Sequence, residues 1–134
     1  MIVKLTQYSK NRFYKSFQEY HVPAEFADPI YNYFVHGLQP GGFFMAMLAN
    51  DFMGAISRSH PANTVEALKL LVTWLENSRS KHLIWGDYPT VERWTRADEG
   101  YKRSVLESIG LIYSEEKEIW MTLKGEKDLP VVLF

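Results

Sequence analysis

The residues of this 134-residue chain that could do chemistry are four histidines and one Asn–Asp pair. Imidazole nitrogens together with a carboxylate are common ligands of zinc and other transition metals. The candidates are His21, His36, His60, His82, Asn50 and Asp51. Each histidine stands alone beside a predicted turn or helix end, which is more typical of capping or solvated side chains than of ligands. We therefore predict no metal site.

The sequence contains none of the short motifs that carry common enzyme chemistry. It lacks the nucleophile elbow Gly-x-Ser-x-Gly, the P-loop, the Gly-x-Gly-x-x-Gly fingerprint, the His-Glu-x-x-His zinc motif and the EF-hand spacing. There is no cysteine, which excludes disulfides and thiolate chemistry. Glu115, Glu116 and Glu118 fall in a predicted polar turn, where solvated charges are more typical than an acid–base pair. We therefore predict no enzymatic activity, no catalytic residues and no cofactor.

Aromatic side chains make up 15% of the chain, so several of them must fill a core or lie at an interface. Trp85, Tyr88 and Trp94 are grouped around Gly86 and Pro89, in and after a predicted connector. Tryptophan and tyrosine contribute much of the binding energy at protein interfaces. These three aromatic residues are the predicted protein-binding surface.

The elements that must position these residues follow from hydrophobic periodicity and helix-stop signals. They predict a mainly α-helical fold, a bundle of five to six helices with a C-terminal β-hairpin (α+β). The predicted helices are 11–20, 29–36, 43–56, 64–78, 90–95 and 101–109, with N-caps at Ser9, Asp28 and Asn63, a stop at Gly37, and a hairpin over 111–123. The apolar tail 129–134 is predicted to dock as an edge strand. The length fits one domain, with a helical part over about 9–100 and the hairpin part over about 101–134.

The predicted helix 43–56 is apolar nearly all round, which indicates a central helix or an oligomer interface. A homodimer through residues 41–56 is therefore a possible assembly. Asn50 and Asp51 interrupt the apolar run, and a buried polar group costs about 1 to 3 kcal/mol unless it is hydrogen-bonded. We expect both side chains to bond to the turn at 40–42 or to a neighbouring helix end.

The formal net charge is −1, so the chain has neither the basic surface of a typical nucleic-acid-binding protein nor the charge of an acidic DNA mimic. The first residues lack the apolar stretch of a signal peptide. The longest mostly apolar run, 41–56, is shorter than the roughly 20 residues that a membrane-spanning helix needs. We expect a cytoplasmic protein without a membrane partner.

A Tyr-rich helix, a Pro-Gly turn and the Asn–Asp pair follow one another between residues 23 and 94. The pattern consists of Pro29–Gly37, Pro40–Phe44, Ala46, Leu48, Asn50–Asp51, Ala55, Asn63, Trp85–Gly86, Val91 and Trp94. In order and spacing it resembles a family of small uncharacterised proteins encoded by bacteriophages and prophages. Asp87–Tyr88 departs from the family pattern, and the C-terminal third is an addition to it. The resemblance implies a phage-encoded accessory protein. We expect it to bind and modulate a protein of the bacterial host, with inhibition as the favoured effect; the candidates are a defence-system component and a component of the transcription or replication machinery.

The C-terminal half carries a second pattern, in which Ser104–Ile112 is followed by a turn and by Ile119–Gly125. This pattern resembles the end of a winged-helix domain, with helices at 64–78, 90–96 and 101–109 and a wing at 111–123. The resemblance implies that Arg96, Lys102 and Arg103 contact the DNA backbone and that Lys117 lies at the wing tip. Three glutamates in the same wing oppose phosphate binding. A DNA-binding regulator is therefore the alternative to a protein-binding role.

Overall fold

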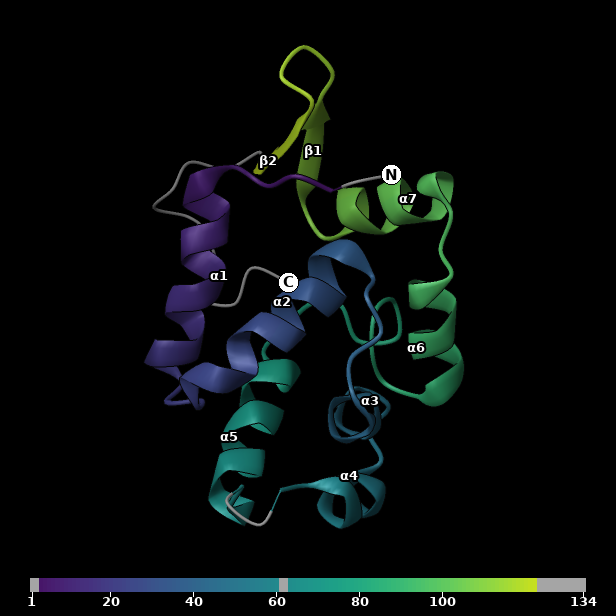
Figure 1. Ribbon diagram of the computed structural model, residues 1–134. Coiled ribbons are helices and arrows are strands. Elements are labelled where there is room, and N and C mark those ends of the chain that lie inside the picture. Colours follow the sequence, from purple (N-terminus) through teal and green to yellow (C-terminus); the bar gives the residue numbers. More distant parts are fainter. Residues whose placement is uncertain (1–2, 61–62, 123–134) are drawn as a thin grey trace.

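The computed structural model describes residues 3–60 and 63–122, and these residues form a mainly helical fold with a two-stranded β-hairpin (Figure 1). The helices are α1 (Gln7–Glu19), α2 (Ala27–His36), α3 (Gly42–Leu48), α4 (Phe52–Arg58), α5 (Val65–Glu76), α6 (Tyr88–Thr95) and α7 (Glu99–Ser108), and a 3₁₀ turn, Ala24–Phe26, precedes α2. Strands β1 (Leu111–Ser114) and β2 (Ile119–Thr122) pair antiparallel, with Tyr113 opposite Trp120. The predicted α+β class is confirmed. The tail 129–134 lies outside the described residues.

The largest correction concerns the predicted helix 43–56, which is two helices separated by a sharp break. Asn50 adopts the left-handed conformation, with φ of 62°, which asparagine tolerates better than most residues. Asp51 then caps α4, because its carboxylate Oδ1 accepts the Gly54 N–H at 2.9 Å. An aspartate side chain accepts a hydrogen bond from a free N–H at a helix start, whereas inside a helix the backbone N–H groups are already paired and aspartate is unfavourable. The polar pair thus ends one helix and begins the next.

Helix boundaries elsewhere shift by a few residues from their predicted places. Thr6, not Ser9, caps α1, and Thr64, not Asn63, caps α5. Helix α2 starts at Ala27, so Asp28 lies inside its first turn instead of capping it, and its carboxylate accepts the Tyr14 hydroxyl at 2.7 Å. Gly37 ends α2 in the left-handed conformation as predicted, with φ of 67°. Shifts of one to three residues at the start of a helix are common, because several neighbouring polar residues can satisfy the same free N–H groups.

The core is built around tryptophan and phenylalanine rings. Trp74 of α5 stacks between Phe17 of α1 and Phe34 of α2, with ring centroids 4.7 and 5.4 Å apart. Its indole N–H donates to the buried Ser16 hydroxyl at 2.8 Å. Hydrophobic side chains of α1 to α7, of the connector before α6 and of the hairpin belong to one buried cluster. The helices and the hairpin therefore share a single core, as a one-domain chain requires.

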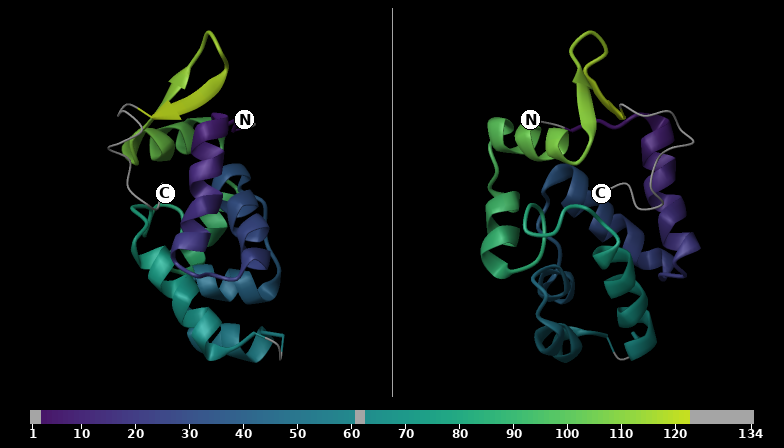
Figure 2. Two further views of the ribbon diagram at one scale, coloured as in Figure 1. Left: turned by 90° about the vertical axis from the view of Figure 1, so that its left-hand side faces the viewer. Right: turned by 180° about the vertical axis from the view of Figure 1, so that it is seen from behind.

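The long axis of the molecule runs from the hairpin to the pair α4 and α5. The hairpin projects at one end, where β1 packs on α7, and α4 lies with the beginning of α5 at the opposite end (Figures 1 and 2). Helix α3 packs on α4 and on α6 and so joins the far end to the middle of the molecule. No helix within residues 3–60 and 63–122 is long and apolar enough to cross a membrane.

Candidate functional site

The structure places Trp85 and Trp94 in the core and not on a binding surface. Trp94 is fully buried, and its indole N–H donates to the Tyr33 carbonyl of α2 at 2.8 Å. Trp85 is also buried and donates to the Ser78 hydroxyl at 2.9 Å. The prediction that these rings contact a partner is therefore wrong. Both rings fill space between helices, and both indole N–H groups have an internal acceptor.

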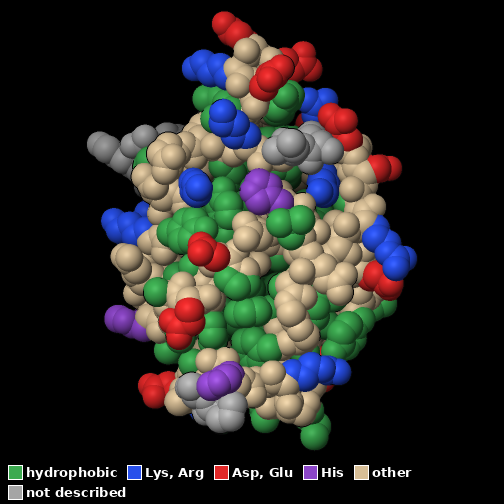
Figure 3. Space-filling model, in the orientation of Figure 1, with side chains coloured by type: hydrophobic (Ala, Val, Ile, Leu, Met, Phe, Trp, Pro, Cys, Tyr) green, Lys and Arg blue, Asp and Glu red, His purple; other side chains and the backbone are tan. Residues whose placement is uncertain are grey.

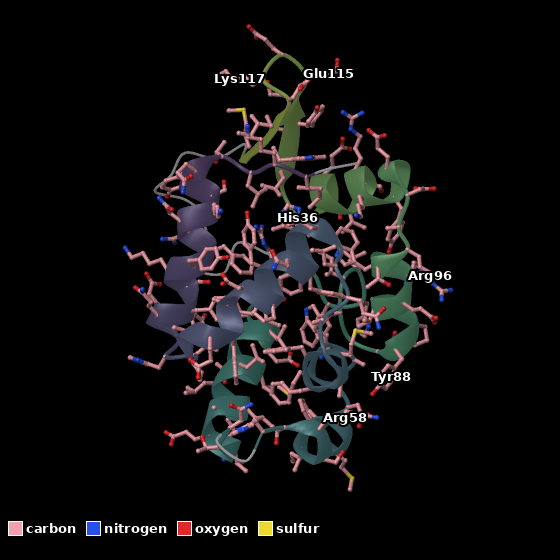
Figure 4. All side chains as sticks on the ribbon, viewed as in Figure 1. His36, Arg58, Tyr88, Arg96, Glu115 and Lys117 are labelled. Atoms are coloured by element: carbon pink, nitrogen blue, oxygen red, sulfur yellow. The ribbon has the colours of Figure 1, made fainter. Side chains whose placement is uncertain are left out.

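Tyr88, the third predicted contact, is 45% exposed at the start of α6. Its hydroxyl donates to Asp51 Oδ2 at 2.7 Å, and Arg58 lies beside the pair (Figure 4). The hydrogen bonds from Tyr88 and from the Gly54 N–H lower the pKa of Asp51, and the same carboxylate raises the pKa of Tyr88. A Cβ at position 54 would collide with Asp51 and Arg58. This cluster joins the break between α3 and α4 to α6.

Large apolar side chains are exposed at the end of the molecule formed by α4 and the start of α5. Met53 is 85% exposed, Val65 63%, Ile56 55% and Phe52 41%. Phe52, Ile56 and Val65 line a groove of about 400 Å³ between the two helices, together with Leu68, Val72, Lys69 and Thr73. Figure 3 shows hydrophobic side chains projecting at this end of the molecule. We call this surface the α4–α5 groove.

Local sequence explains why the α4–α5 groove is open. Only Ala55 of α4 is buried, so this short helix contacts the core through a single small side chain. Helix α5 buries Leu68, Leu71 and Trp74 on one face. Val65 extends that apolar face beyond the end of the core. The apolar face of α5 is thus longer than the core that covers it. The groove could be found in the sequence only by knowing that 43–56 breaks at Asn50.

The four residues implied in DNA binding do not form a basic surface. Lys102 is buried, and its ammonium donates to the His36 carbonyl at the end of α2 at 3.3 Å. This contact is favourable because the last carbonyls of a helix carry negative partial charge. The implied contact of Lys102 with a DNA backbone is therefore wrong for this structure.

The other three cationic side chains lie next to carboxylates. Arg103 packs over the Tyr113 ring at 4.8 Å and lies 4.0 Å from Glu115. Arg96 pairs with Glu92 at 3.2 Å on the same helix. Lys117 is exposed at the hairpin tip, which also carries three glutamates (Figure 4). Nearby carboxylates weaken the attraction of these cations for phosphate groups.

The histidines are spread over the molecule. His21 and His82 adopt the left-handed conformation, with φ of 59° and 68°, and His36 ends α2. Among residues 3–60 and 63–122, no group of three or more His, Asp or Glu side chains is arranged to hold a metal ion.

Comparisons of the chain with protein-family models, with curated proteins and with solved structures found no match.

Proposed function

We propose that this protein acts by binding a segment of another protein in the α4–α5 groove. The observation that carries the proposal is the exposure of Phe52, Met53, Ile56 and Val65 at one place, while the large side chains of the core are buried. Contiguous apolar surface of this kind marks interaction sites on soluble proteins. It is also the surface type that accepts the apolar face of a short helix.

The chemistry of the groove indicates which segment would fit. Lys69 is the single charged residue among the described residues that line it, and the others are apolar apart from Thr73. An amphipathic segment with an apolar face and one acidic residue would complement both features. The resemblance to phage-encoded proteins leads us to propose a protein of the bacterial host as the partner, and inhibition of that protein as the effect.

The test compares two isoleucines that are exposed at opposite ends of the molecule. Ile56→Glu places a charge in the α4–α5 groove, and Ile112→Glu makes the same change on the hairpin. Surface substitutions of this kind usually change stability by only about 0.5 kcal/mol. Thermal unfolding should show that both variants stay folded.

Tagged wild type and both variants are then used to capture proteins from bacterial lysate with and without nuclease treatment. We expect one protein to be retained by the wild type and by Ile112→Glu, and lost with Ile56→Glu. Cross-linking the captured protein to the wild type should place its contact at α4 and α5. Equal capture by all three forms would exclude the groove as the contact, and loss of all capture on nuclease treatment would favour the DNA-binding alternative.

A second copy of the chain is the remaining occupant of the groove, and it gives a different result. Sedimentation of the wild type would then show a dimer whose fraction rises with concentration and disappears with Ile56→Glu. We expect a monomer, because the exposed apolar patch consists of only four side chains and stable dimers usually bury roughly 800 Å² on each partner.

A further inference from the structure

A second pocket lies far from the α4–α5 groove, where the N-terminal segment crosses the start of α1 and the end of α2. Its volume is about 310 Å³, at the lower end of the range for small-molecule sites. The described residues that line it are Val3, Lys4, Leu5, Gln7, Lys10, Tyr31 and His36. The pocket thus combines a largely buried apolar floor with four polar side chains.

The basic groups of this pocket are two lysines, which are cationic, and His36, which becomes cationic when it is protonated. Lys4 and Lys10 are exposed, and neither forms an ion pair with a carboxylate of the described residues. No Asp or Glu is among the described lining residues. Figure 3 shows Lys or Arg side chains on either side of the histidine that Figure 4 labels as His36. The pocket therefore concentrates positive charge without an internal counter-charge.

The environment of His36 agrees with this arrangement. Burial lowers the pKa of His36, and the positive charges of Lys102 and Lys10 lower it further. Lys102 has a structural role, because it donates to the last carbonyl of α2. Lys10 has a different setting, since its ammonium lies over the Tyr31 ring, 5.6 Å from the ring centre, and both residues line the pocket. A bound anion would offset the positive charges of Lys102 and Lys10 that act on His36.

We propose that this pocket binds a small organic phosphomonoester, with its phosphate at Lys4, Lys10 and His36 and its organic part against Tyr31, Val3 and Leu5. A phosphomonoester carries a charge of about −1.5 to −2 near neutral pH, so the charges of two lysines nearly balance it. A carboxylate carries a single negative charge and would balance only one lysine. The apolar floor favours an ester over free phosphate. This site is separate from the α4–α5 groove and does not depend on the function proposed for it.

The experiment uses adenosine 5′-monophosphate as the phosphomonoester, with inorganic phosphate and adenosine as its two parts. Binding is followed by calorimetry and by the NMR titration of the histidine ring protons. We expect the monophosphate to bind more tightly than phosphate, and adenosine to bind much more weakly than either. The pKa of His36 should rise when the monophosphate is bound, because the anion offsets the charges of Lys102 and Lys10 and stabilises the protonated ring.

Three charge-removing variants locate the site. Lys4→Gln and Lys10→Gln should each weaken monophosphate binding about tenfold or more, as expected for a lost hydrogen bond between charged groups. Lys15→Gln removes the same charge from α1 outside the pocket and should leave the affinity unchanged. Equal affinities in all forms, or no binding of monophosphate by the wild type, would overturn the proposal. Much tighter, strongly salt-dependent binding of duplex DNA than of the monophosphate would overturn it as well, and would identify nucleic acid as the ligand.

Discussion

At the scale of the residue, burial decides what each aromatic side chain does. Trp94 and Tyr88 lie on the same short helix, α6, and each makes one hydrogen bond through its polar atom. Trp94 makes its bond inside the core, to the Tyr33 carbonyl, which also accepts the Gly37 N–H. Tyr88 makes its bond at the surface. An aromatic side chain with a polar atom therefore has a structural role at position 94 and remains accessible at position 88.

Replacing each of these two rings by phenylalanine should show the difference. Trp94→Phe removes a buried hydrogen bond, while the Tyr33 carbonyl keeps the Gly37 N–H as a donor. We expect a loss of about 0.5 to 1.5 kcal/mol in the free energy of unfolding from the hydrogen bond, with a further loss from the cavity beside the smaller ring. Tyr88→Phe removes an exposed hydrogen bond and should cost less than about 1 kcal/mol. Urea denaturation measures both values. Equal losses would mean that Trp94 is not held as the structure shows.

At the scale of the element, the pair Asn50–Asp51 determines where one apolar segment becomes two helices. The left-handed conformation of Asn50 turns the chain, and the Asp51 carboxylate begins α4. This break allows Phe52 and Ile56 to lie beside α5 and form one side of the α4–α5 groove.

Substitutions at position 50 test the break directly. Asn50→Ala should destabilise the protein by about 1 kcal/mol, because an alanine in the left-handed conformation costs roughly 1 to 2 kcal/mol. Asn50→Gly should be neutral or slightly stabilising, since glycine adopts this conformation without a steric penalty. Thermal unfolding of the two variants gives the comparison. If alanine proved the more stable of the two, α3 and α4 would form a continuous helix in solution.

At the scale of the whole molecule, one core joins the helices and the hairpin. Trp74, Trp85, Trp94 and Trp120 come from α5, the connector, α6 and β2, and all four belong to the same buried cluster. Helices α3 and α6 pack on each other across about 40 residues of sequence. The two predicted parts, about 9–100 and 101–134, are therefore not separate in the described residues.

This shared core predicts a single cooperative unfolding transition. Far-UV circular dichroism reports the helices, and tryptophan fluorescence reports the four buried rings in different elements. Because all of them depend on the same core, the two signals should change at the same urea concentration, as in other small two-state domains. A fluorescence transition that precedes the loss of helix would show that part of the molecule unfolds alone.

The sequence alone determined much of this architecture. The periodicity of Phe13 and Phe17, the stop at Gly37 and the polar turn between Tyr113 and Trp120 are local signals, and the helices and hairpin they predict are present. These features could be predicted because a helix face, a left-handed cap and a hairpin depend on residues a few positions apart. The boundary shifts at Thr6 and Thr64 have the same origin, since neighbouring polar residues compete for one cap.

The tertiary structure alone decided which of these residues are accessible. Trp85 and Trp94 are aromatic residues beside turns, as surface contacts often are, but their burial depends on α2 and α3, which come much earlier in the chain. The open face at Ile56 and Val65 and the cationic pocket at Lys4, Lys10 and His36 likewise combine segments that are distant in sequence. Burial and electrostatic surroundings depend on every neighbour in space, and hydrophobic periodicity records only the neighbours along the chain.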